Sequence, residues 1–303
     1  MIYVDVKGNL GNQLFIYSFA RSLQKQTGQK ICLNTTYLSK YYPEYKYSLD
    51  DYILNPNVYV EKKKKLPFFM NIYSLPSKAI LRLLAKSPKI DNRISILAFN
   101  FFSKYGFFIW LKETYINIKI RPHKNYYVTG FWQSPKYFDQ IKKNLENELK
   151  PKHNLLKHNK ELFDIICQKE TICVTIRRGD YVSNSKIKDS YYLCGPEYFL
   201  EGVNEIRKKY SEAVVVCFSD DIEWVKNNID FKCETYYESG TDPVWEKLRL
   251  MSACKHFVIS NSSFSWWAEY LSTRNGCVIA PSKWYVDERP VDIYREGWKY
   301  IKV

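Results

Sequence analysis

Apolar and polar positions alternate most regularly in the second half of the chain. Short apolar runs of the kind that form buried strands alternate there with stretches in which apolar residues recur at helical spacing. The predicted strands cover residues 171–176, 213–218, 235–237, 256–260 and 277–280, the last of them being the final strand. The predicted helices cover residues 196–210, 222–229, 243–254 and 263–271, with Asp242 as the N-cap of the third. This alternation predicts a doubly wound parallel sheet.

The first half opens with a strand, a turn, a helix and a second strand. These elements are predicted at residues 2–6, 8–12, 14–23 and 30–33. A unit of this kind places functional groups at the carboxyl end of its first strand. Further along, residues 77–86 and 94–108 have the pattern of amphipathic helices. We expect them to form a helical cap at about residues 66–112.

Proline and lysine cluster at residues 150–152, and this cluster marks the predicted domain boundary. It divides the 303 residues into an N-terminal domain at 1–152 and a C-terminal domain at 153–303. Both halves have the size of a common domain, and a hydrophobic share of 46% is enough for a core in each.

The formal net charge is +14, which indicates a polyanionic partner. Nothing in the sequence resembles a zinc finger, an RNP signature or a basic zipper region, so a nucleic acid is not expected. Phosphorylated substrates and anionic membrane surfaces remain. One basic segment forms either a solvated loop or a docking patch for an anionic bilayer. It consists of Lys62, Lys63, Lys64 and Lys65, followed by Phe68 and Phe69.

None of the eight cysteines lies in a CxxC pair, and most fall in or beside apolar runs. We therefore expect free thiols in a reducing compartment. The sequence starts directly as a strand, and no apolar stretch reaches the ~20 residues that span a bilayer. The expected location is cytoplasmic, with peripheral contact to the inner face of the membrane as the alternative.

Three predicted strands of the second half are each followed by a polar loop. Parallel strands end at one edge of their sheet, so these loops should meet there. After the first strand come Arg177 and Arg178, whose guanidiniums suit a diphosphate. The alternative for this loop is a structural ion pair of one arginine with Asp180. We expect one arginine to form that pair and the other to reach the ligand.

The other two loops are less specific by themselves. Asp220 and Asp221 could hold a cation, act as acid and base, bind a nucleoside or only cap a helix. The run 260–267 crowds hydroxyl groups and an asparagine at a predicted helix start, which is a ready phosphate site. In the N-terminal turn, Gly11, Asn12 and Gln13 allow close backbone approach and amide contacts to sugar hydroxyls.

Taken together, these loops resemble the α-1,2-fucosyltransferases (glycosyltransferase family 11). The resemblance rests on residues 8–15, 176–181, 218–221 and 259–267, with 131–134 and 136–138 as a further segment, and runs nearly the full chain. It implies an α/β fold of the GT-B-like kind, with two Rossmann-type domains facing a cleft and helical additions to the first. The family usually has a histidine two residues before the first arginine, where this chain has Thr175.

The resemblance also implies the chemistry. L-fucose would pass with inversion from GDP-fucose to the 2-OH of a galactose-terminated oligosaccharide, and this acceptor could be lipid-linked. The transfer would need no metal or other cofactor. Arg177 would hold the β-phosphate as the catalytic residue, and Gly11, Asn12 and Gln13 would lie on the acceptor side. The implied donor-binding residues are Arg177, Arg178, Asp180, Thr175, Asp220, Asp221, Asn261, Ser262, Ser263, Phe264 and Ser265.

Two alternatives remain open from the sequence. One is a transferase for another GDP-linked deoxy sugar, such as colitose. The other is a sugar-nucleotide-binding or glycan-binding protein of the same fold without activity. A base for the acceptor hydroxyl is not evident, and the candidates are Glu246, Glu269 and Asp180.

Overall fold

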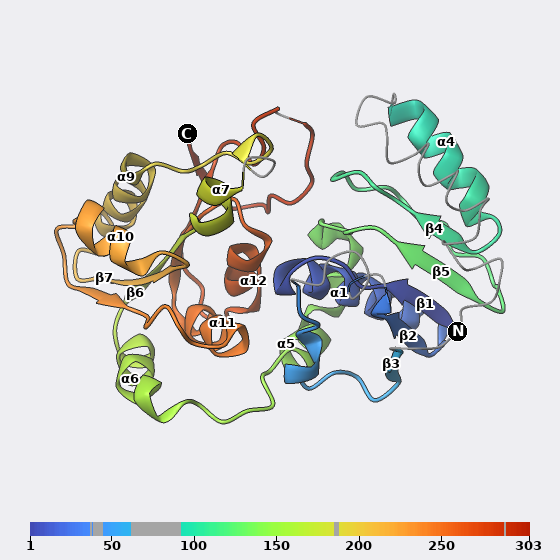
Figure 1. Ribbon diagram of the computed structural model, residues 1–303, viewed down its shortest axis with the longest axis horizontal. Helices are drawn as coiled ribbons and strands as arrows, with labels where there is room; N and C mark the ends of the chain where they lie inside the picture. The colour runs from blue at the N-terminus through green and yellow to red at the C-terminus, as the bar shows by residue number, and fades with distance from the viewer. Residues whose placement is uncertain (37, 39–44, 62–91, 185–187, 288) are drawn as a thin grey trace. The chain divides into compact units, whose positions relative to one another are not determined.

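The first strands of both halves lie in the middle of parallel sheets (Figure 1). The computed structural model describes residues 1–303 except 37, 39–44, 62–91, 185–187 and 288. These residues form two units. The first unit comprises Met1–Leu149 and Val291–Ile293, and the second comprises Lys150–Pro290 and Tyr294–Val303. The helix predicted at 77–86 and the lysine patch with Phe68 and Phe69 lie outside the described residues.

The first unit is an α/β unit with a five-stranded sheet in the order β3-β2-β1-β5-β4, all strands parallel. Its strands are β1 (Ile2–Asp5), β2 (Ile31–Asn34), β3 (Val58–Glu61), β4 (Phe107–Ile109) and β5 (Tyr126–Thr129). Its helices are α1 (Leu10–Thr27), η1 (Leu49–Asp51), α4 (Asn92–Ser103), η3 (Pro135–Tyr137), η4 (Asp139–Ile141) and α5 (Lys142–Glu148). The chain leaves β1 toward β2 and β3 on one side and reaches β4 and β5 on the other.

Helix α1 begins at Leu10, four residues before the predicted start at residue 14. It can begin there because Gly8 turns the chain sharply, with φ +68. A Cβ at Gly8 would lie 2.5 Å from the Asn12 side chain, so only glycine fits this approach. Gly11, Asn12 and Gln13 therefore belong to the first helical turn and not to a loop.

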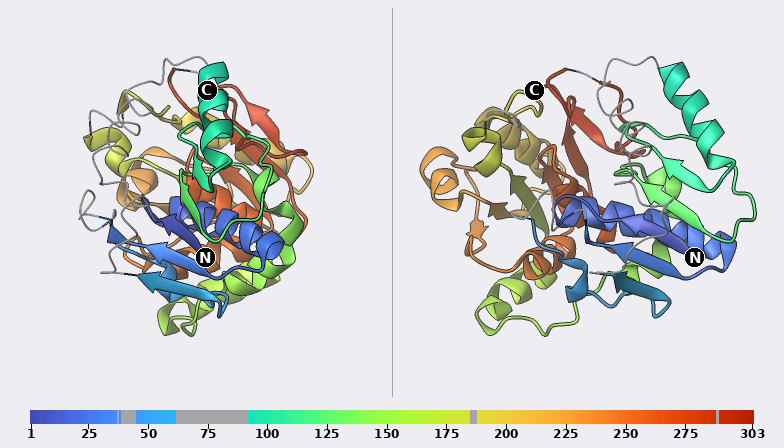
Figure 2. Two further views of the ribbon diagram at one scale, coloured as in Figure 1. Left: turned by 90° about the vertical axis from the view of Figure 1, so that its right-hand side faces the viewer. Right: turned by 45° about the vertical axis from the view of Figure 1, so that its right-hand side comes forward.

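The helix predicted at residues 94–108 is wrong in its second part. Helix α4 ends at Ser103, a turn containing Gly106 follows, and β4 then pairs in parallel with β5. Figures 1 and 2 show α4 beside β4. The aromatic residues of β4 form their backbone hydrogen bonds in the sheet, and Phe108 is buried there. Tertiary pairing overrides the local helical pattern at this point.

The second unit is also α/β, and its parallel six-stranded sheet has the order β11-β10-β9-β6-β7-β8. Its strands are β6 (Thr171–Ile176), β7 (Val214–Ser219), β8 (Thr235–Tyr237), β9 (His256–Ile259), β10 (Val278–Pro281) and β11 (Lys299–Ile301). Its helices are η5 (Lys157–Asn159), α6 (Lys160–Gln168), α7 (Gly179–Ser183), α9 (Pro196–Arg207), α10 (Ile222–Asn228), α11 (Val244–Ala253) and α12 (Ser263–Leu271). The expected doubly wound parallel sheet is confirmed.

Two details of the second unit differ from the prediction. Strand β10 is not the last, because β11 adds to the edge of the sheet beside it. The N-cap of α11 is Pro243, and the Asp242 carboxylate makes no capping hydrogen bond. Asp242 is held elsewhere, as described below.

None of the eight cysteines forms a disulfide, as expected from the sequence. Cys173, Cys194, Cys217 and Cys254 are buried in the second unit, and Cys32 is buried in the first. Across the described residues, no helix combines the length and the apolar character needed to cross a bilayer.

Candidate functional site

The three polar loops of the second half leave three adjacent strands, β9, β6 and β7. Strand β6 is the first of its sheet, and the chain winds from it to β7 and β8 on one side and later to β9 and its neighbours on the other. The sheet reverses its winding between β6 and β9, and open parallel sheets bind ligands outside the carboxyl ends of the strands at such a point. Arg177 follows β6 there, and Ser260 follows β9.

Asp220, at the end of β7, holds the arginine loop in place. Its Oδ2 lies 2.7 Å from Nη1 of Arg177, and its Oδ1 accepts a hydrogen bond of 2.8 Å from the backbone N–H of Arg178. Gly179 lets the loop come this close, because a Cβ there would lie 2.8 Å from the same carboxylate. One aspartate thus fixes both the direction of the backbone and the guanidinium of Arg177.

Arg178 has different surroundings from Arg177. Its guanidinium carbon lies 3.4 Å from the centre of the Trp224 ring, a cation–π contact, and its Nε lies 3.5 Å from Oδ2 of Asp221. Asp221 also caps α10, since its Oδ1 accepts a hydrogen bond from the backbone N–H of Trp224. Arg178 is thereby packed into the wall of the loop, and its side chain is 16% exposed against 31% for Arg177.

Each arginine lies beside an aspartate of the loop after β7: Asp220 is beside Arg177, and Asp221 is beside Arg178. The expected pair of one arginine with Asp180 stays a prediction. The backbone of Asp180 lies in α7, and its side chain lies outside what the structure describes. The alternation of elements predicts that β6 and β7 end at the same edge of the sheet. The register that aligns Ile176 with Ser219 decides which aspartate lies beside which arginine.

The serine-rich loop after β9 divides into structural and exposed groups. Ser262 caps α12 by accepting a hydrogen bond from the backbone N–H of Phe264, and Ser265 shares a buried hydrogen bond with Ser260. Ser262, Ser263 and Phe264 are half-buried at the first turn of α12, where helix N–H groups create a positive potential. These three positions are the part of the loop that remains partly exposed.

Asn261 and Thr175, both predicted to bind the donor, make hydrogen bonds within the protein. The Asn261 amide is 1% exposed and donates to the backbone carbonyls of Tyr192 and Trp284, at 2.7 and 2.8 Å. The Thr175 hydroxyl is buried and accepts from the backbone N–H of Ser260, so it joins β6 to β9. Both side chains stabilise the loops that carry the site.

Gln13, which was predicted on the acceptor side, also makes hydrogen bonds within the protein. Its fully buried amide donates to the carbonyls of Gly8 and Lys46 and accepts from the N–H of Ser48. It therefore fastens residues 46–48 to α1. Asn12 is half-buried, and its Oδ1 accepts a hydrogen bond of 2.7 Å from Gln133.

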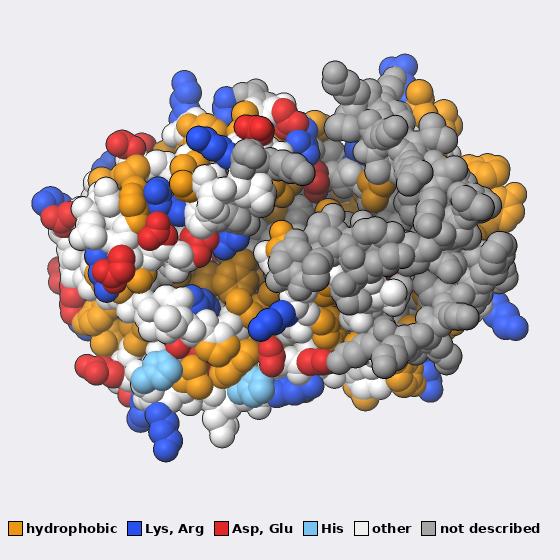
Figure 3. All heavy atoms as spheres, viewed as in Figure 1, with side chains coloured by type: hydrophobic (Ala, Val, Ile, Leu, Met, Phe, Trp, Pro, Cys, Tyr) orange, Lys and Arg blue, Asp and Glu red, His pale blue; other side chains and the backbone are white. Residues whose placement is uncertain are grey.

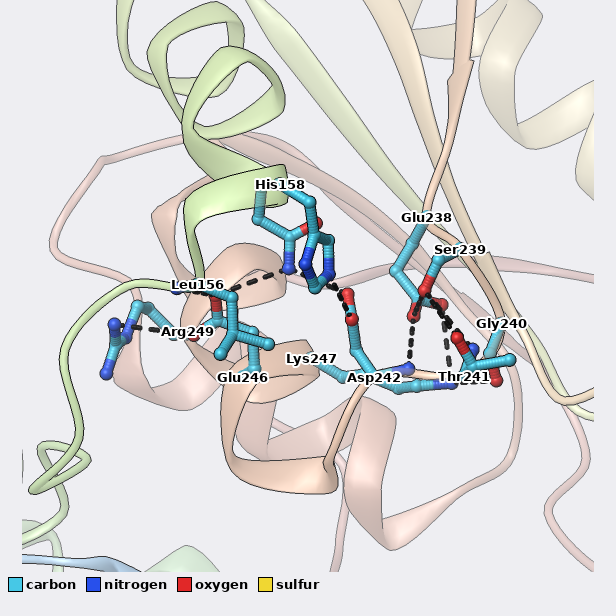
Figure 4. A network of polar contacts seen from close by, with 11 residues as sticks. Leu156, His158, Glu238, Ser239, Gly240, Thr241, Asp242, Glu246, Lys247 and Arg249 are labelled. Atoms are coloured by element: carbon cyan, nitrogen blue, oxygen red, sulfur yellow. Dashed lines mark hydrogen bonds and ion pairs between the residues drawn. The ribbon is translucent and has the colours of Figure 1, made fainter.

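Two of the three candidate bases are engaged within the protein. Figure 4 shows the fully buried Glu246 accepting from the backbone N–H of Leu156, with its other oxygen 3.3 Å from Arg249. Glu269 receives two hydrogen bonds from one nitrogen of Arg295, at 2.6 and 2.7 Å. Neither carboxylate is available to remove a proton from a substrate in this arrangement.

The network in Figure 4 also explains Asp242. Its carboxylate binds Nε2 of His158 and the amide of Asn159, both at 2.7 Å. Asp242 and Glu246 together tie residues 156–159 to the start of α11. No local sequence pattern predicts this network, because its members are about 85 residues apart in the chain.

Comparison with known proteins identifies the family. Residues 1–302 match the family described as glycosyl transferase family 11. The chain belongs to glycosyl transferase family 11. It is 31% identical over 312 residues to the alpha-1,2-colitosyltransferase of Escherichia coli, covering 100% of this chain and 99% of that protein. It is 24% identical over 315 residues to the O-antigen biosynthesis glycosyltransferase WbnK of Escherichia coli, covering 98% and 99% of the two chains.

Other similarities are more distant. The human galactoside alpha-(1,2)-fucosyltransferase 1 is 22% identical over 173 residues, which cover 54% of this chain and 47% of that protein. Among solved structures, NodZ alpha-1,6-fucosyltransferase soaked with GDP-fucose has a TM-score of 0.49 at 12% identity, covering 95% and 96% of the chains.

In this family 11 member, a buried charged cluster that the sequence pattern did not predict lies at the equivalent edge of the first unit. Asp5 ends β1 fully buried and accepts hydrogen bonds from Asn34 and Tyr127, and Lys7 donates to Thr129 at the end of β5. Burial raises the pKa of Asp5 and lowers that of Lys7. The signal that could have revealed it was a charged residue inside the apolar run at residues 2–6.

Proposed function

We propose that this glycosyltransferase moves L-fucose from GDP-fucose to the 2-OH of a galactoside, with inversion, in the synthesis of a surface glycan. One observation carries the proposal. Arg177 and the first turn of α12 lie at the carboxyl ends of two paired strands, β6 and β9. Two sources of positive potential at such an edge suit the diphosphate of a nucleotide sugar.

In the proposed reaction, the acceptor oxygen attacks the anomeric carbon of fucose as the bond to the β-phosphate oxygen breaks. The bonding electrons leave with GDP, so negative charge grows on its β-phosphate. Arg177, oriented by Asp220, stabilises this charge together with the N–H groups of α12. The acceptor proton leaves to solvent or to a base, for which Asp180 is the remaining candidate.

We propose that the transfer needs no metal ion. In P-loop and kinase sites a divalent cation neutralises the departing phosphate, and here Arg177 and the helix terminus would supply that charge. Within the described part of the chain, no group of three or more His, Cys, Asp or Glu side chains is placed to hold a metal ion by itself. A guanidinium suits this role because it remains charged at all physiological pH values.

The proposed acceptor is a galactose-terminated oligosaccharide, with Gly11 and Asn12 on its side of the enzyme. The names of the Escherichia coli relatives support synthesis of a bacterial O-antigen. A lipid-linked oligosaccharide on the cytoplasmic side would fit, since eight cysteines without a disulfide are typical of a reducing compartment.

A second donor, GDP-colitose, is favoured by a specific observation. The relative that matches the whole chain at 31% identity is named an alpha-1,2-colitosyltransferase, whereas the human fucosyltransferase matches 54% of the chain at 22%. Colitose lacks one hydroxyl of fucose. A pocket that hydrogen-bonds this hydroxyl rejects the deoxy sugar by about 10⁴-fold or more, while an apolar pocket discriminates far less.

A donor and acceptor matrix tests the proposal. Purified protein is incubated with GDP-fucose or GDP-colitose and with lactose, N-acetyllactosamine or lacto-N-biose, and kcat/KM is measured for each pair. We expect a product with an α-linkage to O-2 of galactose, assigned by NMR, and the higher kcat/KM with GDP-fucose. A higher value with GDP-colitose would reassign the donor, and a product linked at another hydroxyl would refute the acceptor position.

A further inference from the structure

Helix α4 carries a row of large apolar side chains on its exposed side. Ile94, Leu97 and Phe101 are 56%, 69% and 55% exposed, and Tyr105, just after the helix, is 63% exposed. At 3.6 residues per turn, the three helical members lie within about 60° of one another. In Figure 3, hydrophobic side chains reach the surface where α4 lies.

The opposite side of α4 already serves the core of the first unit. Phe99 is buried and contacts Phe108 of β4 and Trp110, with ring centres 6.1 and 5.7 Å apart. An ordinary surface helix has one apolar side facing the core and polar residues facing water. Because α4 is apolar on both sides, its outward row is not needed for packing against β4. We refer to Ile94, Leu97, Phe101 and Tyr105 as the outer row.

Charge indicates what covers the outer row. Residues 92–112 contain Arg93, Lys104 and Lys112 and no aspartate or glutamate. Arg93 and Lys104 are exposed, and on a helical wheel both flank the same edge of the row. Exposed leucine, isoleucine and aromatic residues beside basic ones, without acidic residues, are typical of a helix that lies in the surface of an anionic bilayer.

We propose that the outer row of α4 docks the enzyme on an anionic lipid bilayer, with its apolar side chains among the acyl chains and Arg93 and Lys104 at the headgroups. The side chains form a convex ridge on one helix, which a fluid bilayer can cover without a matching groove. The inference is independent of which sugar is transferred. Docking would keep the enzyme at the surface where lipid-linked acceptors are found.

Vesicle co-sedimentation tests the docking. The full chain is mixed at low salt with vesicles of phosphatidylcholine alone or of phosphatidylcholine with phosphatidylglycerol. We expect binding to the anionic vesicles only, and release at about 1 M salt, where the Debye length is about 3 Å. Absence of binding at low salt, or equal binding to neutral vesicles, would overturn the proposal.

Matched variants test the surface itself. Leu97→Ser with Phe101→Ser removes apolar area without adding charge, and we expect it to lower the bound fraction about tenfold. The control is Ile53→Ser, which removes a 51% exposed side chain elsewhere in the first unit and should bind like the wild type. Unchanged thermal unfolding and unchanged rates with a soluble acceptor show that the double variant is folded.

Three outcomes contradict the assignment. If the double variant binds as well as the wild type, the outer row is not the docking surface. If Ile53→Ser weakens binding equally, the effect is not specific to α4. If the wild type sediments as a dimer that the double variant abolishes, a second copy of the chain covers the row instead.

Discussion

Replacing Arg177 by lysine separates its charge from its shape. Lysine keeps the positive charge and can still pair with Asp220, whose Oδ2 lies 2.7 Å from the Arg177 guanidinium. It loses the planar fork that binds two phosphate oxygens at once. The substitution therefore leaves the loop folded and removes part of the stabilisation offered to the departing GDP.

Arg177→Lys should affect the free energy of unfolding and kcat to different extents. The side chains of Arg177 and Asp220 are 31% and 25% exposed, so their ion pair belongs to the class worth about 0.2–1 kcal/mol. The free energy of unfolding should change by less than that. Loss of one donor to charge that develops in the transition state costs about 2.7–4 kcal/mol, so kcat should fall about 10²-fold or more.

The assay is initial-rate kinetics with saturating acceptor, combined with thermal unfolding of the same preparations. Arg178→Lys is the matched control, because Arg178 stacks on Trp224 at 3.4 Å and its side chain is 16% exposed. Lysine there loses the planar stack, which we expect to affect stability and the KM for the donor more than kcat.

Two results would refute this reasoning. If Arg178→Lys lowers kcat more than Arg177→Lys does, the roles of the two arginines are reversed. If Arg177→Lys retains the wild-type kcat while thermal unfolding is also unchanged, the guanidinium does not stabilise the leaving group.

Two further predictions concern metal ions and pH. Transfer should proceed at an unchanged rate in excess EDTA, and loss of activity that manganese or magnesium restores would contradict the metal-free proposal. Burial of Asp242 disfavours its charge, but hydrogen bonds from Asn159 and His158 outweigh this and hold its pKa below the ordinary value. A lowered pKa adds stability above about pH 4, which is lost as the pH falls through the folded value. Asp242→Asn should therefore be less stable at neutral pH and should lose less stability on acidification in denaturant titrations. If the free energy of unfolding of Asp242→Asn falls with decreasing pH as steeply as that of the wild type, Asp242 contributes nothing to this pH dependence.

Much of the second unit could be predicted because its elements have strong local patterns. Strand β6 was predicted with its observed bounds, since Thr171–Ile176 is a continuous run that the sheet buries on both sides. Helix α12 was predicted as well, because a hydroxyl-rich cap precedes a helical apolar pattern. Strand order and winding then imply which loops share an edge, so Arg177 and the α12 start could be brought together from the sequence.

Tertiary structure decided what each side chain at that edge does. Asp220 and Arg177 are 43 positions apart, and only the register of β6 against β7 brings them into contact. Asn261 lies among serines that look equally ready to bind a ligand, yet its amide turns inward to two carbonyls. The direction of a side chain depends on distant backbone groups, and no local pattern records where these lie.

The same reason explains the errors in secondary structure. Residues 107–109 have the composition of an amphipathic helix, but β5 offers an open edge, and pairing there satisfies their backbone and buries Phe108. Strand β11 is short and has no clear pattern of its own, and it exists because β10 provides a partner. Periodicity along the chain determined the helices and strands of this protein. Contacts between distant segments determined which polar groups make hydrogen bonds within the protein and which remain for a ligand.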